Sequence, residues 1–292
     1  MGNIFKRLFG KKTKSLSDIK IIFSDIDGTL YNRQGELRPQ TRRYALELHK
    51  AGVNLILATG REHQVAEEAL DGLGLTAPII SLDGALVREP GSGKILHIHP
   101  IEEKYIAPLF KEIENHKISF TIMTPEGNYY NEEPDLPSHL QHPETKHFKT
   151  EALPKAKDNF LRIFLTGNRA FITSLYEKIQ KNQLLHVNDF TTYESRRESG
   201  KHYLEIKPHT SNKGIAVSHI LQARGLQPAD AAGIGDYRND VEMLRACGYR
   251  VAMADAVAEL RDIADYITSK NCEEGGIEEF FQMVLKAKRN AL

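Results

Sequence analysis

The sequence predicts an α/β fold with a parallel-sheet core and an inserted α+β domain. Two observations predict the core: short apolar runs alternate with helical periods near both ends of the chain, and acidic or polar residues directly follow several of these runs. A third observation predicts the insertion, because the middle of the chain carries longer segments in which apolar and polar residues alternate. With 292 residues, the chain can form two separate hydrophobic cores.

The core elements follow from this alternation. Pro39 suits an early position in the first helix, where its missing N–H costs no hydrogen bond. The first part of the core is expected to hold strands at 19–24, 53–58 and 78–82, with helices at 39–51 and 62–73. The second part is expected to hold strands at 203–207, 230–234, 249–252 and 265–267, each followed by a helix. Strands joined by helices in this way form parallel sheets.

The insertion is expected to be an α+β domain. It contains predicted strands at 118–123 and 160–165 and predicted helices near 102–115 and 168–182. A polar, proline-containing segment at 132–157 is expected to be a mobile connection. The predicted organisation is a basic tail at 1–17, the first part of the core at 18–84, the inserted domain at 85–201 and the second part of the core at 202–292.

Asp25-Ile26-Asp27-Gly28-Thr29 follows the first apolar run. Asp25 and Asp27 share one face if the chain stays extended, and burying two carboxylates is costly unless a cation or a reaction needs them. The glycine permits a sharp turn, and the hydroxyl and amides that follow suit phosphate oxygens. The segment therefore predicts a nucleophile, an acid/base and a phosphate cradle, with an ordinary surface turn as the alternative.

Three later segments favour the catalytic interpretation. Thr59-Gly60-Arg61 ends the second strand with a hydroxyl, a flexible backbone and a cation, although Thr59 alone could be a helix N-cap. Lys213 lies where a helix is expected to begin, which suits an anion unless it is an ordinary surface lysine. Asp236 follows a strand, and Asp240 is expected one turn further along the same helical face.

In this order, the segments resemble the four signature motifs of the haloacid dehalogenase superfamily. Asp-Ile-Asp-Gly-Thr at 25–29 and Gly-Asp-Tyr-Arg-Asn-Asp at 235–240 carry the resemblance, which extends from about residue 18 to the C-terminus. Ala-Thr-Gly-Arg at 58–61, Lys213 and Val-Ala-Met-Ala-Asp-Ala at 251–256 resemble the Cof-like phosphatase branch. That branch has a Rossmann-like core and a large cap, which the inserted domain matches in position and size.

The resemblance implies a role for each motif residue. Asp25 would attack phosphorus, and Asp27 would protonate the leaving oxygen and then activate water. The expected ligands of Mg²⁺ are the carboxylates of Asp25 and Asp236, the main-chain carbonyl of Asp27 and, directly or through another ligand, Asp240. The expected phosphate-binding residues are Thr59, Gly60 and Lys213, and the expected substrate-binding residues are Arg61, Asp83, Gly84 and Asn239.

Two departures from the branch concern substrate contacts. Asp83 stands where an Asn-Gly-Ala segment would have Asn, and Ala254-Asp255 replaces a usual Gly-Asn. A carboxylate at position 83, near the junction of core and cap, is expected to disfavour a second anionic group on the substrate.

The predicted function is Mg²⁺-dependent hydrolysis of small phosphorylated metabolites, such as sugar phosphates, through an aspartyl-phosphate. A phosphomutase or phosphotransferase would use the same two aspartates and stays open as an alternative. A regulatory binding module on the same fold also stays open, although the complete set of motif residues argues against it. Dehalogenation is disfavoured because Asp27 would then have no leaving oxygen to protonate.

Composition limits the expected partners and location. The 39 basic and 39 acidic residues balance, so no global charge favours nucleic acid. Two cysteines are too few for a disulfide framework, and a cytoplasmic location is expected. His97 and His99, and a later group of histidines, are expected to be ordinary polar residues at the surface rather than ligands of a zinc ion. Residues 1–14 combine five cations with apolar residues at helical spacing, which predicts either a flexible tail or weak, salt-sensitive contact with anionic membranes.

Overall fold

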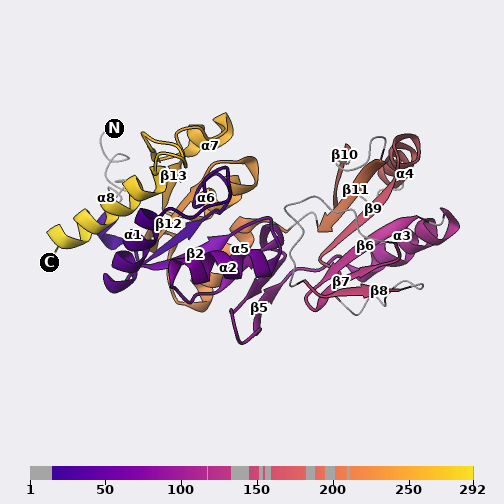
Figure 1. Cartoon of the computed structure of the whole chain (residues 1–292), viewed down its shortest axis with the longest axis horizontal. Coiled ribbons are helices and arrows are strands. Elements are labelled where there is room, and N and C mark those ends of the chain that lie inside the picture. The colour runs from indigo at the N-terminus through magenta and orange to yellow at the C-terminus, as the bar shows by residue number, and fades with distance from the viewer. Residues whose placement is uncertain are drawn as a thin grey trace, which may run out of the picture. The chain divides into compact units, whose positions relative to one another are not determined.

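The structure is a computed structural model that divides into two compact units (Figure 1). The core unit comprises Met1–Ala58, Ala69–Ala77 and Val217–Leu292, and the insert unit comprises Thr59–Glu68 and Pro78–Ala216. The residues that the structure describes are 15–116, 118–132, 145–150, 154, 159–181, 188–194, 201–208 and 211–291. The basic segment 1–14 and most of the proline-containing segment 132–157 lie outside the described residues.

The core unit holds five parallel strands in the order β14-β13-β12-β1-β2. Their bounds are β1 Ile21–Ser24, β2 Asn54–Ala58, β12 Ala231–Gly235, β13 Tyr249–Ala252 and β14 Tyr266–Ile267. Strands β1 and β12 are buried throughout, as expected for central strands of a parallel sheet. Because β1 and β12 are parallel neighbours, the residues that follow these two strands leave the sheet at the same edge.

Helices α1 (Pro39–Lys50) and α8 (Gly276–Asn290) of the core unit lie side by side (Figure 1). Arg38 and Thr41 both bond the buried carboxylate of Glu278, at 2.8 and 3.0 Å, and so join the start of α1 to α8. Two short helices, α6 (Val241–Ala246) and α7 (Ala258–Ile263), belong to the same unit. The boundary between the units falls within α2 (His63–Leu73) and α5 (Lys213–Ala223).

The insert unit contains a six-stranded sheet in the order β10-β11-β9-β6-β7-β8. Their bounds are β6 Ser119–Thr124, β7 Gly127–Tyr130, β8 His147–Lys149, β9 Arg162–Asn168, β10 Asn188–Glu194 and β11 Lys201–Pro208. Only the β7–β8 pair is parallel. The unit also holds α3 (Glu103–His116), α4 (Arg169–Lys181) and the strands β3 (Ile79–Ser81), β4 (Leu86–Arg88) and β5 (Ile95–Ile98), in which β4 pairs antiparallel with both neighbours.

Each face of the six-stranded sheet carries an apolar cluster. One face packs Ile163, Leu165 and Leu204 against residues of α3 and α4, including Ile106 and Leu175. The other face packs a second cluster around the turn that precedes β4: Leu82, Ala85, Leu86, Met123, Leu161, Phe164 and Tyr203. The sheet therefore supports the segment that contains Asp83.

The α/β fold with a parallel core sheet is confirmed, but the strand expected at 78–82 is β3, which belongs to the insert unit, and one further expected core strand pairs in the six-stranded sheet. The strand expected at 203–207 is β11, which pairs antiparallel with β9 and β10 in the insert unit. Its sequence, Tyr-Leu-Glu-Ile-Lys, alternates in the way that is typical of antiparallel strands, whereas the parallel core strands are continuously apolar. Within the described residues, no helix combines the length and apolar character needed to cross a membrane.

Candidate active site

Three carboxylates of the core unit lie close together. Asp25, Asp236 and Asp240 each offer an oxygen within 4.8 Å of the others. Asp25 directly follows β1 and Asp236 directly follows β12, and these parallel strands are in register from Ile21 to Ser24. The Asp25 amide donates to the Ile234 carbonyl at 3.0 Å, which continues the pairing beyond the end of β1. The strand order therefore brings together acids that are more than two hundred residues apart in sequence.

Asp25 and Asp27 differ in their exposure. Asp25 is 6% exposed, whereas Asp27 is exposed to solvent, and the side chain of Ile26 between them is fully buried. The expectation that both carboxylates are buried is therefore wrong for Asp27. The chain leaves the extended conformation after Ser24, and the Ile26 carbonyl accepts hydrogen bonds from the amides of Leu30 and Tyr31 at 3.0 and 2.8 Å. This turn separates the environments of the two acids.

Asp240 is fixed by the backbone that carries Asp236. One of its oxygens, Oδ2, accepts from the amides of Asp236 and Tyr237 at 3.2 and 3.1 Å. The expectation that the two acids share a helical face is wrong, because Asp236 precedes the short helical turn Arg238–Asp240 and the carboxylate of Asp240 folds back over it. A Cβ at Gly235 would lie 2.5 Å from Oδ2 of Asp240, so this fully buried carboxylate fits only above a glycine.

The hydroxyl of Thr29 bonds an acid of the cluster. Thr29 is 1% exposed, and its Oγ1 donates to Oδ1 of Asp236 at 3.2 Å. We expected this hydroxyl to suit a phosphate oxygen, and it instead orients Asp236. Gly28 has a φ of +78°, and a Cβ there would lie 2.5 Å from Oδ2 of Asp236. The Gly28-Thr29 pair therefore both makes room for Asp236 and holds it.

The carboxylate cluster has the donor chemistry of a magnesium site. Mg²⁺ prefers hard oxygen ligands and commonly uses one or two carboxylates together with water and phosphate oxygens. Asp25, Asp236 and Asp240 provide such oxygens in a largely buried position, and buried carboxylates need a compensating charge. The carboxylate of Asp27 is not in this group, and a contribution of Asp27 through its main-chain carbonyl stays a prediction.

The expected phosphate-binding residues belong to the insert unit. Thr59 is 1% exposed; its amide donates to the Ile80 carbonyl at 2.9 Å, and its Oγ1 accepts from the amide of Arg61 at 3.1 Å. The alternative that Thr59 caps a helix is wrong, because α2 begins only at His63. Thr59 and Gly60 therefore belong to a tight turn between β2 and α2.

Lys213 is fully buried, with 0% exposure, at the first position of α5. The alternative of an ordinary surface lysine is therefore wrong. Asn212 precedes it, and the Asn212 side chain accepts from the amide of Ile215 at 3.0 Å, as an N-cap does. Lysines are rarely buried completely unless they meet a negative partner, so this position favours an anion.

Leu82, Asp83 and Gly84 form a turn in which all three residues have positive φ, at 50°, 54° and 95°. The amides of Leu82 and Asp83 each donate at 3.0 Å, to the carbonyls of Arg61 and Thr59. A Cβ at Gly84 would lie 2.4 Å from the Asn212 carbonyl oxygen, so the glycine permits close approach to the start of α5. Within the insert unit, this turn therefore joins the Thr59 and Lys213 segments.

Asp83, which we expected to disfavour a second anionic group on the substrate, is paired with two cations. Its Oδ2 lies 3.0 Å from Nη2 of Arg162 and 3.7 Å from Nζ of Lys207. Repulsion of a second anionic substrate group by Asp83 is thus largely offset. Arg162 gave no signal in the sequence beyond its place inside the apolar strand predicted at 160–165, and only the pairing of strands reveals its position.

Arg61 and Asn239, the other expected substrate-binding residues, differ in exposure. Arg61 is half-buried in the turn that contains Thr59, whereas Asn239 is exposed on the helical turn between Asp236 and Asp240. They belong to different units, Arg61 to the insert unit and Asn239 to the core unit.

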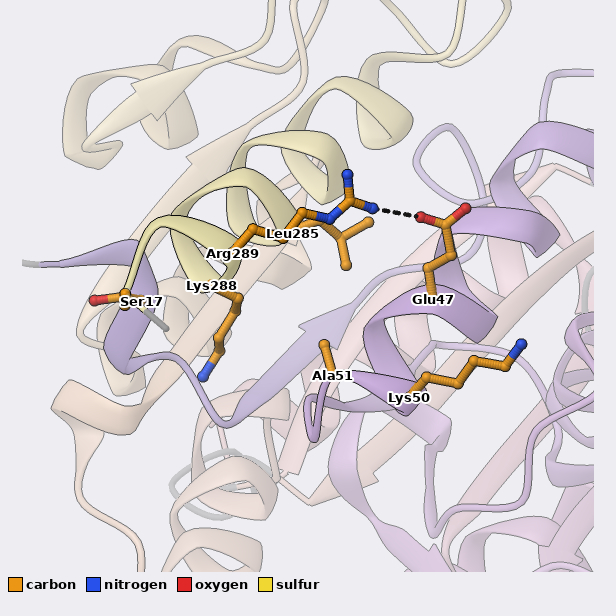
Figure 2. Close-up of a pocket in the computed structure, with 8 residues that line it drawn as sticks. Ser17, Glu47, Lys50, Ala51, Leu285, Lys288 and Arg289 are labelled. Carbon is orange, nitrogen blue, oxygen red and sulfur yellow. Dashed lines mark hydrogen bonds and ion pairs between the residues drawn. The ribbon is translucent and has the colours of Figure 1, made fainter.

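A cavity of about 680 Å³ lies elsewhere in the core unit, near the C-terminal ends of α1 and α8 (Figure 2). Lys50, Lys288 and Arg289 line it, and Arg289 pairs with Glu47 at 3.2 Å. None of the predicted catalytic, metal-binding or phosphate-binding residues is among its lining residues.

Comparison with known proteins identifies relatives that match most of the chain. The model of the haloacid dehalogenase-like hydrolase family matches residues 22–281. Phosphatase YwpJ of Bacillus subtilis is 24% identical over 281 residues, covering 88% of this chain and 97% of that protein. The 5-amino-6-(5-phospho-D-ribitylamino)uracil phosphatase YwtE of the same organism is 24% identical over 292 residues and covers 92% and 99%. The solved structure of TM0651 from Thermotoga maritima has a TM-score of 0.76 at 20% identity, covering 90% of this chain and 97% of that one.

Proposed function

Because the chain belongs to the haloacid dehalogenase-like hydrolases, we propose that it is a Mg²⁺-dependent phosphatase that acts on small phosphorylated metabolites through an aspartyl-phosphate. It belongs to the Cof-like members of that superfamily and is a phosphoric monoester hydrolase that works by phosphoryl transfer. The observation that carries the proposal is the group of three carboxylates formed by Asp25, Asp236 and Asp240.

The first chemical step is assigned to Asp25. A carboxylate oxygen attacks phosphorus, and the bond from phosphorus to the leaving oxygen breaks. Asp27 gives its proton to that oxygen, so the alcohol departs as a neutral molecule. The exposure of Asp27 supports this role, because an exposed carboxyl can reach the leaving group of a bound substrate and exchange protons with water.

The second step returns Asp25 to its starting state. Asp27, now a carboxylate, takes a proton from water as the water oxygen attacks phosphorus, and the bond from phosphorus to Asp25 breaks to release inorganic phosphate. Two of the proposed metal-binding residues, Asp236 and Asp240, would hold Mg²⁺ together with Asp25. The bound ion would offset the repulsion between an anionic nucleophile and an anionic phosphoryl group.

Residues of the insert unit are proposed to stabilise the negative charge on the phosphoryl oxygens. We assign Thr59, the Gly60 amide and Lys213 to the phosphoryl oxygens, on which transition-state charge develops. Complete burial of Lys213 supports this assignment, since a cation without water around it interacts strongly with an anion. Arg61, Gly84 and Asn239 are proposed to contact the rest of the substrate. Side chains of the inserted cap segment 85–201 are proposed to contact it as well, except for Arg88, whose guanidinium is bound to the main-chain oxygen of Pro125.

The proposed substrate class is broad. YwtE acts, by its name, on a phosphorylated ribitylamino-uracil, which is a phosphomonoester of a small polyhydroxylated metabolite. Sugar phosphates, pyridoxal phosphate and flavin mononucleotide belong to the same chemical class. A phosphomutase would pass the phosphoryl group to a second hydroxyl instead of water, and release of inorganic phosphate distinguishes the two outcomes.

A phosphate-release screen over a panel of such monoesters tests the proposal. With Mg²⁺, at least one monoester is expected to release phosphate, and excess chelator should abolish the release. Ca²⁺ should inhibit, because it prefers more oxygen ligands at longer distances than Mg²⁺ does. Full activity in chelator, or no release from any monoester, would contradict the proposal.

We also propose a cytoplasmic location, which the two buried free cysteines, Cys247 and Cys272, support. Weak attachment of residues 1–14 to anionic membranes stays a prediction, because this segment lies outside the described residues. Co-sedimentation with anionic liposomes at low salt, compared with a chain that lacks residues 1–14, tests it. Equal binding of the two chains would rule out a membrane role for the segment.

A further inference from the structure

We propose that Arg162 is a positioning residue that holds the phosphate-binding turn Thr59-Gly60 in place through Asp83. The inference rests on the proposed function, because that function assigns Thr59 and Gly60 to the phosphoryl oxygens. All the residues involved belong to the insert unit.

Arg162 is almost completely buried, at 2% exposure, and is surrounded by polar partners. Its Nη2 donates to Oδ2 of Asp83 at 3.0 Å, and its Nη1 lies 3.2 Å from Oε1 of Glu205. Nη1 also reaches the main-chain oxygen of Gly60 at 3.5 Å. One guanidinium thus contacts the Thr59-Gly60 turn directly and the Asp83 turn through a charged hydrogen bond.

The six-stranded sheet places this guanidinium. Arg162 is the first residue of β9. Phe164, two residues further along the same strand, belongs to the apolar cluster that packs around Leu82. Side chains two residues apart in a strand share a face, so Arg162 points to the face on which the Asp83 turn is seated. Glu205 and Lys207, on β11, share a face in the same way and complete a cluster of two acids and two cations.

Asp83 transmits the position of Arg162 to the phosphate-binding turn. Its amide donates to the Thr59 carbonyl at 3.0 Å. A Cβ at Gly60 would lie 2.9 Å from Oδ1 of Asp83, so the carboxylate packs directly against the Gly60 backbone. Movement of Asp83 would therefore shift both the Thr59 carbonyl and the Gly60 backbone.

The geometry of the cluster requires an arginine. A guanidinium presents several donors in a planar fork and can serve two carboxylates and a carbonyl at once. An ammonium at this position keeps the charge but is a single point, so it cannot hold Asp83, Glu205 and Gly60 together. Arg162→Lys therefore removes the positioning while it avoids leaving two acids without a cation.

The test compares Arg162→Lys with Arg88→Lys. Arg88 is a matched control: it belongs to the same unit, it is part-buried, and its Nη2 donates at 2.7 Å to a main-chain oxygen, that of Pro125. For Arg162→Lys we expect the inhibition constant of inorganic phosphate and the KM for p-nitrophenyl phosphate each to rise about tenfold, with a smaller fall in kcat. Arg88→Lys should leave both constants unchanged.

Hydrogen–deuterium exchange provides a readout that does not depend on catalysis. The amides of residues 59–62 and 82–84 should exchange faster in Arg162→Lys than in the wild type, and Arg88→Lys should not have this effect. If Arg162→Lys does not fold, Asp83→Asn serves in its place, because its amide oxygen still accepts from Arg162 but the ion pair is lost. Asp83→Asn should then show the same changes to a smaller degree.

The outcomes separate the inference from the proposed function. A wild-type protein that releases no phosphate from any monoester contradicts the proposed function, and the exchange rates then still decide the role of Arg162. The inference would be overturned if a folded Arg162→Lys variant kept the wild-type inhibition constant for inorganic phosphate, the wild-type KM and the wild-type amide exchange rates. Equal changes in Arg162→Lys and Arg88→Lys would also overturn it, because a general loss of stability would then explain them.

Discussion

The Thr29 hydroxyl donates to Oδ1 of Asp236 across 3.2 Å, joining two residues that are 207 positions apart in the sequence. Thr29 belongs to the turn after β1, and Asp236 directly follows β12. Both strands lie at the centre of the parallel sheet, so the bond connects the two turns that supply the proposed metal ligands. A hydrogen bond to a ligand carboxylate fixes its orientation before the ion binds.

Loss of this hydrogen bond should weaken magnesium binding. In Thr29→Val, which keeps the shape of the side chain, the Mg²⁺ concentration for half-maximal activity should rise by roughly 10- to 100-fold. Thr41→Val is a matched control, because Thr41 is also buried and donates to a carboxylate, that of Glu278, at 3.0 Å. A Thr29→Val variant with the Mg²⁺ dependence of the wild type would show that the bond does not support the site.

Gly28→Ala should impair the site for a steric reason that can be isolated. Gly28 and Gly35 have nearly the same φ, +78° and +79°, so alanine causes similar backbone strain of about 1–2 kcal/mol at either position. Only at Gly28 would the new Cβ meet another group, Oδ2 of Asp236 at 2.5 Å, because nothing lies within 4 Å at Gly35. Thermal unfolding should therefore change alike in the two variants, while Mg²⁺-dependent activity falls only in Gly28→Ala. Equal activity in both would contradict the steric account.

His63 should make stability depend on pH. Burial lowers the pKa of His63 from 6.5 to about 4; the charge of Glu67 raises this pKa by a smaller amount, and the charge of Arg88 lowers it further. The His63 side chain is 6% exposed, and its Nδ1 has no hydrogen-bond partner among the described residues. The unfolded chain therefore binds a proton more readily than the folded chain, and the stability contributed by neutral His63 is lost as pH falls from 6.5 towards 4.

The expected loss over this interval is on the order of 2–3 kcal/mol, measured as the free energy of unfolding in urea. His63→Gln should remove this part of the pH dependence. His49→Gln, a change at an exposed histidine near the end of α1, should retain it. If the pH dependence of His63→Gln matches that of the wild type, another group is responsible.

The sequence was sufficient to predict the carboxylate cluster, because motif residues that follow parallel strands are brought to one edge by the strand pairing itself. Asp25 and Asp236 illustrate this, since each directly follows a strand that was predicted within one or two residues. The different exposure of Asp27 was not predictable, because β1 ends at Ser24 and a turn closed on the Ile26 carbonyl follows, where the prediction assumed an extended chain through Asp27.

The side-chain contacts across the six-stranded sheet also could not be predicted from the sequence. Arg162 meets Asp83 and Glu205 only because β9 pairs with β11 and the Asp83 turn packs on the same face. Arginine is usually a surface residue, and the burial of Arg162 follows from tertiary structure alone. The alternation of apolar and polar residues in β11 is visible in the sequence and by itself indicates an antiparallel strand. The prediction instead followed the position of this strand in the sequence, which is next to the second part of the core.

The central claim is that Asp25 carries the phosphoryl group during turnover, and intact-protein mass spectrometry after rapid quenching tests it most directly. With Mg²⁺ and p-nitrophenyl phosphate, whose leaving group needs no proton, Asp27→Asn should accumulate protein heavier by one phosphoryl group, because the neutral amide cannot activate water. Asp25→Asn should show no such species, and its kcat should fall by at least about 10³-fold while its fold is retained. A phosphorylated Asp25→Asn protein, or one with substantial turnover, would contradict the account.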